Sequence, residues 1–546
     1  MKKAVILLLA LVMLASLAAC GGSGGNAGGT APPAGSTTPA NTTPVIPGVT
    51  APAVDTGNQT TLADDEPRHG GKLTMVIPGN TFDVPFGVVW HYMTSFRPSH
   101  TFIEALMMET PRGEMFPYLA TSMTPDAEKK EIVYKLRDDV YFPDGTQFNA
   151  EVVAWHVKEW QDSGFLEPTV TGTDIRGEFE IAILMSEYGN WAPNFLSSRV
   201  AGFISMENFL KNGSDYAEQH PMGTGPFVQK EWIPGISITW EKRNDYWQPD
   251  KPYLDEFKFV AMTDSMTQNA AMVSSGADGI DILQTGNPEQ IKTLLDLVDC
   301  YAVGTPTGPM CLLPSSNNEG SPLAIKEVRE ALYYAIDREA ICEARGFGVW
   351  TPSTQVIPDT FYGHLPDRQE ASYDPARAKE LLAKAGFPNG LEMNFYAGAS
   401  SDRDTMVALQ DMMGQVGIKA NLEFPETGLM IELRTKGFEG IMAGGVRPLS
   451  NITSTIFMYF DPNYIYYPMM WRPAELTDLY WTLRTTPLVR QDLMEEYCQV
   501  LMDETIVIPV YDAYSMFVVK NDVHGGGFGT FGAGTEFLPA DIWMTR

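Results

Sequence analysis

The stretch KLRDDVYFPDGTQFNAEVVAWHVKEW, residues 135–160, decides the fold of this chain. Residues 132–142 alternate in part between polar and β-branched or aromatic side chains, which predicts one or two strands. Residues 143–145, Pro-Asp-Gly, predict a turn. Asn149 predicts the N-terminal cap of a helix, with Glu151 in its first turn. The apolar side chains that this helix would turn toward a core are Val152, Val153, Trp155 and Val157.

Length and charge narrow the class of protein. The chain has 546 residues, which allows two to four domains, and 44% of them are hydrophobic, enough for a large core. The formal net charge is −30, from 38 basic and 68 acidic residues. This excess argues against a nucleic acid partner and against electrostatic docking on anionic lipid. It does not identify a cationic solute, because acidic side chains on a large surface mainly keep a protein soluble.

The first twenty residues predict export and lipid attachment. Lys2 and Lys3 precede an apolar run, residues 4–14, that is too short for a structural membrane span. Residues 17–20, Leu-Ala-Ala-Cys, resemble a bacterial lipobox, which implies cleavage after residue 19 and lipid on the sulfur of Cys20. The alternative is an ordinary signal peptide followed by a chance cysteine. We therefore expect an extracytoplasmic protein that is lipid-anchored to the cell membrane, on the periplasmic face or the cell surface.

Residues 20–69 predict a disordered tether behind the signal peptide of residues 1–19. From residue 21 the composition is mainly Gly, Ser, Thr, Pro, Asn and Ala, with almost no large apolar side chains. Such a segment cannot form a core. Its root-mean-square span is about 35–40 Å, enough to hold a folded body away from a membrane.

The sequence offers no residue set for catalysis, a metal or a cofactor, and we expect none. There is no C-x-x-C, H-E-x-x-H or P-loop, and the literal G-x-G-x-x-G at residues 527–532 is followed by no helix that could hold a phosphate. The seven histidines are scattered, which favours structural roles. Export permits disulfides, and four cysteines allow three full pairings, but four buried thiols are equally consistent with a large core. These four cysteines are Cys300, Cys311, Cys342 and Cys498.

Three further motifs follow the opening stretch along the chain. They are Gly-Thr-Gly-Pro-Phe at residues 223–227, Arg-Asn-Asp-Tyr-Trp at residues 243–247, and VREALYYAIDR at residues 328–338. Together with residues 117–160 they resemble, in the same order, the motifs of the extracellular solute-binding proteins of family 5, the dipeptide, oligopeptide and nickel class that serves ABC transporters. The resemblance covers roughly residue 70 to the C-terminus.

This resemblance implies an α/β, periplasmic-binding-protein-like fold with two lobes, of the large type that has an extra domain. Lobe I would comprise residues 70–92, 222–303 and 506–546, the extra domain residues 93–221, and lobe II residues 304–505. Within lobe II the pattern itself alternates helices and strands, which predicts a partly parallel sheet. The expected helices are residues 325–344, 374–385, 405–416 and 488–504, and the expected strands residues 391–396 and 418–424. In lobe I, residues 264–275 predict a helix with Met266, Ala270 and Val273 as apolar positions.

The resemblance also implies a function. The lobes would close over a solute that binds the closed form more tightly than the open form. The transmembrane subunits of an ABC permease would then recognise the closed form. Such a protein is not an enzyme. Two alternatives stay open: a secreted lipoprotein hydrolase acting on glycans, which requires two carboxyl groups flanking a groove, and a sensor that uses the binding-protein fold with another partner.

A departure from the family pattern bears on the solute. Peptide binders of the family carry an acidic residue, in a motif resembling G-W-x-x-D, that pairs with the peptide α-amine. The corresponding stretch here, residues 440–451, has no acid, and Gly445 stands where the Trp would be. Because burying an unpaired ammonium costs several kcal/mol, an ordinary free peptide is disfavoured. Arg447 could instead bind a carboxylate, a phosphate or a hydroxyl cluster, or it is a surface or interlobe residue.

The solute therefore stays open between a peptide, a modified or blocked peptide and an oligosaccharide. Aromatic rings suit sugars and hydrophobic side chains alike, although each ring alone is more often a packing residue. The expected ligand-binding residues are Asn80, Phe82, Trp191, Gly445, Arg447, Asn451, Tyr467 and Trp471.

Overall fold

The computed structural model describes the chain from residue 66 to residue 546 with gaps. The described residues are 66–78, 96–109, 114–164, 166, 169–189, 192–193, 202–276, 279–358, 361, 363–368, 373–399, 401–446, 459–461, 467–486, 490–528 and 537–546. The predicted signal peptide, Cys20 and most of the predicted tether lie outside this part of the chain. No helix among the described residues is long and apolar enough to cross a membrane.

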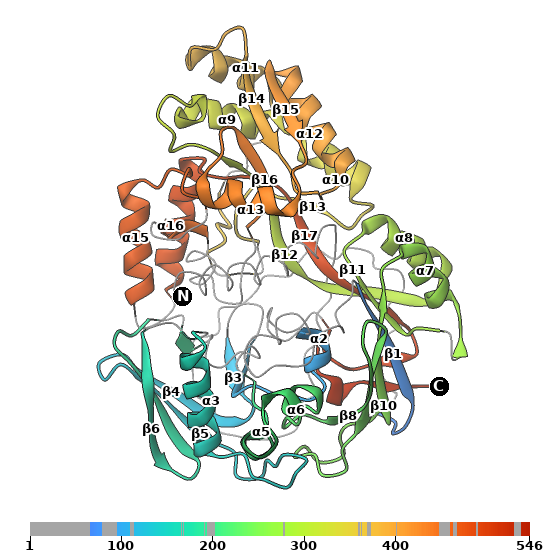
Figure 1. Cartoon of the computed structure of the whole chain (residues 1–546). Coiled ribbons are helices and arrows are strands. Elements are labelled where there is room, and N and C mark those ends of the chain that lie inside the picture. The colour runs from blue at the N-terminus through green and yellow to red at the C-terminus, as the bar shows by residue number, and fades with distance from the viewer. Residues whose placement is uncertain are drawn as a thin grey trace.

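Two long antiparallel strands, β12 (Cys300–Pro314) and β17 (Ile508–Lys520), form the middle of the molecule. They lie in one eleven-stranded sheet of order β15-β14-β16-β12-β17-β11-β1-β10-β9-β8, with β13 pairing to β17. Because other strands join these two at opposite ends, one sheet continues from one lobe into the other (Figure 1). The figure shows the second lobe above and the first lobe below, with β12 and β17 between them.

The first lobe is built on the β1 side of this sheet. β1 pairs in parallel with β10 and β11, whereas β9 pairs antiparallel with β10 and β8. Helices α7 and α8 cover one face over Val76, Leu283 and Val518, and the other face packs around Phe257 and Trp240. The elements are β1 (Lys72–Pro78), β8 (Phe227–Ile233), β9 (Ser237–Lys242), β10 (Glu256–Met262), α7 (Ser265–Val273), β11 (Ile282–Thr285), α8 (Pro288–Leu297), β18 (Val523–His524), η4 (Pro539–Asp541) and β19 (Trp543–Met544).

The second lobe packs its helices around the parallel strands β14, β15 and β16. β14 pairs in parallel with both neighbours, as the alternation of helices and strands predicts. A single hydrophobic cluster fills this lobe. Its elements are η3 (Pro322–Ala324), α9 (Lys326–Ala335), α10 (Arg338–Arg345), β13 (Thr351–Pro352), α11 (Pro375–Lys384), β14 (Leu391–Tyr396), α12 (Arg403–Gln415), β15 (Ile418–Glu423), α13 (Thr427–Lys436), β16 (Ile441–Gly445), α15 (Ala474–Thr485) and α16 (Gln491–Asp503).

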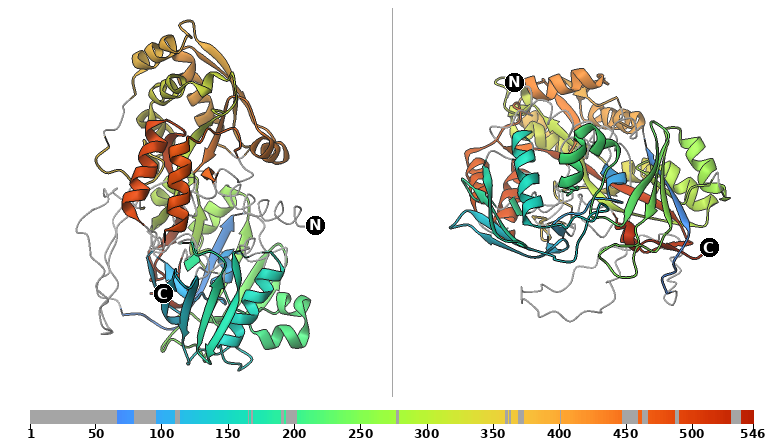
Figure 2. Two further views of the ribbon diagram at one scale, coloured as in Figure 1. Left: turned by 90° about the vertical axis from the view of Figure 1, so that its left-hand side faces the viewer. Right: turned by 60° about the horizontal axis from the view of Figure 1, so that its bottom comes forward.

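The opening stretch of the sequence folds as an added domain on the first lobe. Its antiparallel sheet has the order β4-β5-β7-β6, and α3 packs on one face. Asn149 caps α3 by accepting hydrogen bonds from the N–H groups of Glu151 and Val152, as the sequence predicts. Figure 2 shows this teal sheet and the orange second lobe at opposite ends of the molecule. The elements are α2 (Phe96–Ser99), β2 (Met107–Glu109), β3 (Met115–Pro117), β4 (Ala120–Asp126), β5 (Glu131–Leu136), α3 (Ala150–Asp162), β6 (Val170–Gly177), β7 (Glu180–Met185), α5 (Met206–Asn212) and α6 (Ser214–Gln219).

Two expectations about helices are wrong in detail. The helix expected at residues 325–344 is two helices, α9 and α10, because Asp337 leaves the helical conformation and caps α10 through the N–H of Ala340. Helix α7 forms, but its apolar positions face solvent, with Met266 79% and Val273 57% exposed. The buried face of α7 instead carries Ala271, Met272 and Gln268. The amide of Gln268 donates to the carbonyl of Met262.

Candidate functional site

The lobes are joined where β12 and β17 cross from one to the other. Tyr301 pairs with Val519 in the first lobe, and Leu312 pairs with Ile508 in the second. The register shifts between Pro306 and Gly308 and again between Met310 and Cys311. In β17 only residues 512–514 are partly exposed, whereas the strand is buried on both sides of them. The crossing is therefore the thin connection between two separate cores.

Polar and aromatic side chains flank the crossing. Gln284 of β11 donates to the Ser515 hydroxyl at 2.7 Å on the side of the first lobe. On the other side the hydroxyls of Tyr514 and Thr351 lie 3.2 Å apart, and β13 pairs with β17 next to them. These residues were missed by the sequence reasoning. The signal was the polar break at residues 512–515 in the otherwise apolar run 506–519.

Gly444 and Gly445 end β16 at its edge nearest the crossing. Gly445 pairs with Met310 and Gly444 with Cys311, so β16 stops where β12 leaves the second lobe. Gly445 is exposed, and among the described atoms a Cβ there would meet only the Pro309 carbonyl oxygen, at 3.9 Å. This position is open space rather than a packed contact. Among the described residues, Gly445 therefore leaves room beside the crossing, whereas Gly444 faces Leu313 on the opposite side of the strand.

Tyr467 is brought next to these glycines. Its hydroxyl oxygen lies 3.9 Å from where a Cβ of Gly444 would sit. The residue has a φ of 57°, an uncommon left-handed conformation for a non-glycine residue. Its N–H donates to the carbonyl of Arg434 at 2.8 Å, and its ring stacks on Tyr459 with centroids 6.3 Å apart. Tyr467 therefore lies in the neighbourhood of the glycines, on the face of β16 toward which Gly444 points and opposite to the face toward which the predicted ligand residue Gly445 points.

Trp471 is not part of that neighbourhood. Its N–H donates to the hydroxyl of Ser316, which follows the end of β12 farthest from the crossing. The Arg329 guanidinium lies over its ring at 5.3 Å. The other predicted ligand-binding residues, Asn80, Phe82, Trp191, Arg447 and Asn451, lie outside the described residues.

The recognisable sequence motifs hold the fold together instead of lining a site. Arg243 donates to the carbonyls of Gly223, Gly225 and Tyr141, which ties the first lobe to the added domain. A Cβ on Gly223 would lie 1.8 Å from the carbonyl oxygen of Phe102, so only glycine fits.

In the second lobe two buried arginines act in the same way. Arg329 donates to Glu504, Thr505, Leu323 and Ala324, and Arg338 to Ser353, Pro509, Tyr333 and Ile336.

A buried carboxyl group, Glu104, joins the same motif region. Tyr246 donates to Glu104 Oε1 at 2.6 Å, and Trp247 Nε1 to Oε2 at 2.9 Å. Burial raises the pKa of Glu104, and the hydrogen bonds from the tyrosine and the tryptophan oppose that rise. With both oxygens occupied by side chains of the fold, this carboxyl group is a structural anchor.

The thiols and histidines of the described residues also have structural surroundings. Cys300, Cys311, Cys342 and Cys498 are free and buried, which decides for thiols over disulfides. Burial raises the pKa of the Cys498 thiol to about 12, so it is a poor nucleophile. His156 is fully buried: its Nδ1 lies 2.9 Å from the Val152 carbonyl, and its Nε2 accepts from the N–H of Ile204. Among the described residues, no group of His, Cys, Asp and Glu could hold a metal ion.

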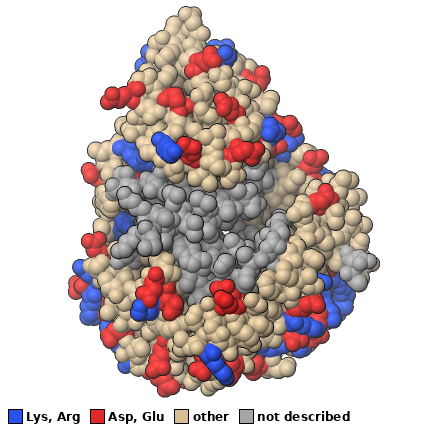
Figure 3. All heavy atoms as spheres, viewed as in Figure 1, with Lys and Arg blue, Asp and Glu red and all other residues tan. Residues whose placement is uncertain are grey.

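A hollow of about 560 Å³ in the second lobe is lined by residues 319–323, 392–394, 421 and 439. Glu392 and Glu439 line it together with Asn421, but these acids are already engaged. Lys419 and Asn421 bind Glu392, and Ser321 donates to Glu439 at 2.7 Å. Acidic side chains are also spread over the visible surface of both lobes (Figure 3), so this hollow does not stand out by charge.

Comparison with known proteins identifies the family that the chain matches. Residues 114–469 match the model described as bacterial extracellular solute-binding proteins, family 5 Middle. Curated relatives include the glutathione-binding protein GsiB of Escherichia coli O6:K15:H31 (strain 536 / UPEC), 30% identical over 326 residues, and GsiB of Shigella flexneri, 29% identical over 329 residues. Each alignment covers 57% of this chain and 61% of the relative, less than two thirds of the relative's length.

Solved structures share the fold over most of the chain. HbpA2 from Haemophilus parasuis superposes with a TM-score of 0.76 at 18% identity, covering 87% of this chain and 100% of that one. NikA from Brucella suis in complex with Fe(III)-EDTA gives 0.74 at 18% identity, covering 87% and 100%. The periplasmic binding protein DppA from Helicobacter pylori in complex with the peptide STSA gives 0.69 at 18% identity, covering 88% and 99%. At these identities the likeness concerns the periplasmic-binding-protein fold.

Proposed function

Because the chain belongs to the bacterial extracellular solute-binding proteins of family 5, we propose that it captures a solute outside the cytoplasm for an ABC importer. Among the described residues, one sheet passes between two separately packed lobes through β12 and β17, and this observation, together with the family match, carries the proposal. A thin connection of this kind suits hinge closure, in which the solute stabilises the closed form.

The proposed domain division follows the packing. Lobe I comprises residues 70–92, 222–303 and 506–546, the extra domain residues 93–221, and lobe II residues 304–505. In support, the described residues fall into one hydrophobic cluster for the second lobe, one for the added domain and two for the faces of the first lobe. The crossing residues 303–309 and 512–515 lie where these clusters meet.

For the solute we propose a small peptide-like molecule, with glutathione as the first candidate. Two relatives are named glutathione-binding proteins. No acid occurs between Glu439 and Asp461, which disfavours an isolated peptide ammonium. In glutathione the free amine sits on the same carbon as a free carboxylate, so the two charges largely balance each other. Arg447 would pair with such a carboxylate.

The proposed solute contacts beside the crossing are Gly445 and Tyr467. Asn80, Phe82, Trp191, Arg447 and Asn451 remain proposed contacts that the described residues do not include. Trp471 also stays a prediction, with its ring on Arg329 and not beside Gly445.

The proposal extends to the cellular setting. Cleavage before Cys20, lipid on its sulfur and residues 20–69 as a tether would hold the protein at the outer side of the cell membrane, within reach of the permease subunits. The alternative of a glycan hydrolase is less favoured than this proposal because the matched family is described as solute-binding. A sensor role would differ only in the partner.

Native mass spectrometry of the purified chain, followed by isothermal titration, tests the proposal. The titration panel is glutathione, free and N-acetylated tripeptides, and short oligosaccharides. We expect one site per chain and saturable binding of glutathione or another peptide-like solute. Tight binding of ordinary free-amine peptides would overturn the argument from the missing acid. Turnover of a glycan without stoichiometric binding would overturn the transport role.

A further inference from the structure

Val349 and Trp350 are neighbours in the chain, but their side chains are buried in different lobes. Both residues are 5% exposed, and both follow helix α10 of the second lobe. Trp350 belongs to the hydrophobic cluster of the second lobe, and its ring stacks on that of Tyr511 with centroids 4.0 Å apart. Val349 instead belongs to the cluster beneath α7 and α8, whose other buried members among the described residues all come from the first lobe. The second lobe therefore places one side chain in the core of the first.

A tight turn directs Val349 toward the first lobe. Directly after α10, the N–H of Val349 donates to the carbonyl of Gly346 at 2.7 Å. The two residues between them, Phe347 and Gly348, have φ of 50° and 79°, as in a type I′ turn. A Cβ on Gly346 would lie 2.5 Å from the carbonyl oxygen of Cys342, so glycine is required where the turn begins.

The segment that carries this turn lies along the crossing. β13 and β11 share the edge of β17 that β12 does not occupy, and each of them comes from a different lobe. β13 pairs with residues 511–512 of β17 and β11 with residues 516–519, so residues 513–515 lie between the two. Because β13 runs antiparallel to β17, the residues that precede β13 lie toward the first lobe. Residues 346–351 therefore extend from the second lobe to the first beside the crossing.

A charge interaction supports the same contact between the lobes. The Arg345 guanidinium, at the end of α10, donates to Asp402 at 3.0 and 2.8 Å, which is the main reason that its pKa is raised. The negative charge of Glu289, in the first turn of α8, contributes to the same rise in pKa. Glu289 belongs to the first lobe, whereas Arg345 and Asp402 belong to the second. The end of α10 and the start of α8 are thus near each other across the two lobes.

We propose that residues 346–351 form a third, non-covalent link between the lobes, in which Val349 limits how far the lobes separate in the solute-free protein. The other two links are the covalent crossings of β12 and β17. Two strands alone leave the lobes free to rotate about them, whereas a side chain buried in the opposite core must be withdrawn before the lobes part on that side. The inference rests on the proposed movement of the lobes but not on the identity of the solute. The competing explanation is that Val349 only fills space in the first lobe.

Distance measurements by electron paramagnetic resonance between two spin labels, one on each lobe, separate the two explanations. The labels are attached to Glu241→Cys on β9 and Lys379→Cys on α11, which replace exposed residues, in a Cys20→Ser background. The other four cysteines are buried thiols and stay unlabelled. Val349→Ala is compared in this parent protein with Val76→Ala, which removes the same two methyl groups from the same cluster but lies wholly within the first lobe.

We expect the distance distribution of solute-free Val349→Ala to be about twice as wide as that of the parent protein. Val76→Ala should keep the parent distribution, although both variants should lower the melting temperature by a similar few degrees. Equal distributions in all three proteins, or equal broadening in both variants, would overturn the link. Should Val349→Ala not fold, Val349→Thr keeps the shape of the side chain and is judged by the same criterion.

Failure of the proposed function would be seen separately. A parent distribution that does not change with a saturating amount of the solute found by titration would contradict closure of the lobes. The link itself would still be decided by the solute-free proteins.

Discussion

Arg243, Arg329 and Arg338 stand in the motifs that identify the family, and each donates hydrogen bonds to carbonyls of separate segments. Such residues are required by the fold whatever the solute. This explains why the sequence indicates the family strongly and the solute weakly. At the residue scale, the feature that we propose to bear on the solute is a missing side chain, at Gly445.

The two glycines give a matched pair of variants. Gly445→Trp introduces a bulky side chain into open space, so we expect Kd for the solute to rise about ten-fold or more. The free energy of unfolding should change by less than about 0.5 kcal/mol. Gly444→Ala is the counterpart, because its Cβ would lie 3.2 Å from Leu313 Cδ1 and should cost about 1 kcal/mol. Urea denaturation and titration of both variants check this; unchanged binding by Gly445→Trp would remove Gly445 from the site.

His156 gives the stability a defined pH dependence. Burial lowers its pKa from 6.5 to about 4, so the folded protein keeps the imidazole neutral while the unfolded chain binds a proton first. The part of the free energy of unfolding that depends on the neutral imidazole is fully present above about pH 6.5. It is lost as the pH falls toward 4, and the loss amounts to at most about 3 kcal/mol. Urea denaturation near pH 7 and near pH 4 should show this loss in the wild type and not in His156→Gln. An identical loss in both proteins would contradict the assignment.

At the scale of elements, the sequence predicts a helix well where residues next to it in the chain cap both of its ends. Helix α11 begins after the cap Asp374 and ends at Lys384, two residues before Gly386, whose φ of 96° closes the helix as the sequence indicates.

The two errors have different causes. Asp337 interrupts the helix predicted at residues 325–344 by capping α10, whereas for α7 the spacing says nothing about which elements lie opposite. The apolar positions predicted for α7 face solvent because the inner side is formed by Ala271, Met272 and Gln268. There Gln268 bonds to Met262 and Gln290.

Asn149 tests the element that opens the added domain. Asn149→Ala removes the acceptor for two N–H groups of α3 and should cost about 1 kcal/mol of unfolding free energy. Asn149→Asp keeps an acceptor and should retain nearly full stability. Thermal unfolding followed by circular dichroism measures both variants. A neutral Asn149→Ala would mean that packing alone sets the start of this helix.

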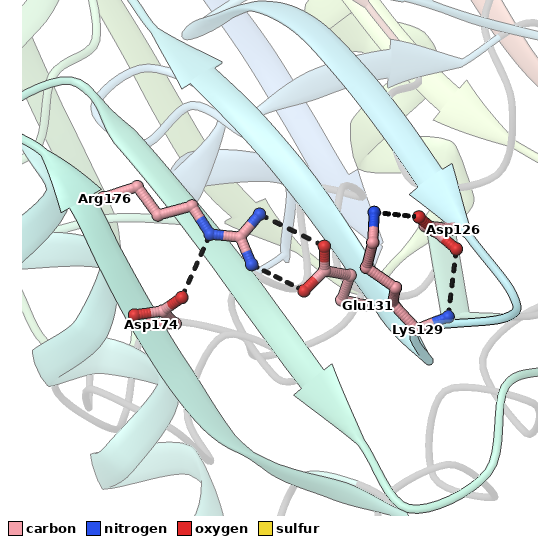
Figure 4. A network of polar contacts seen from close by, with 5 residues as sticks. All are labelled: Asp126, Lys129, Glu131, Asp174 and Arg176. Carbon is pink, nitrogen blue, oxygen red and sulfur yellow. Dashed lines mark hydrogen bonds and ion pairs between the residues drawn. The ribbon is translucent and has the colours of Figure 1, made fainter.

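The sheet of the added domain offers a second comparison. Arg176 donates two hydrogen bonds, of 2.6 and 3.1 Å, to the buried Glu131, whereas Lys129 and Asp126 form a solvent-exposed ion pair (Figure 4). Because Arg176→Met leaves a buried carboxylate unpaired, it should lower the melting temperature by several degrees. Lys129→Met breaks an exposed pair and should leave the melting temperature nearly unchanged. Equal effects in differential scanning calorimetry would contradict this ranking.

At the scale of the whole molecule, the resemblance of four motifs gives the two-lobed fold, and the alternation of helices and strands gives the parallel part of the second lobe. The sequence does not give the continuity of the sheet. The apolar runs at residues 508–511 and 516–519 belong to one strand, β17, because β12 pairs with it across residues 512–515. Of the predicted ligand residues, Tyr467 is brought next to Gly444, the strand neighbour of Gly445, through β16 and α13, a long-range arrangement that no local pattern encodes.

Small-angle X-ray scattering of the purified chain, with and without a saturating amount of the solute found by titration, tests the hinge-closing account most directly. The account predicts that the radius of gyration falls when the solute is added, because the lobes close about β12 and β17. Gly445→Trp at the same solute concentration should keep the value of the free protein. Stoichiometric binding with unchanged scattering would contradict closure of the lobes over the solute.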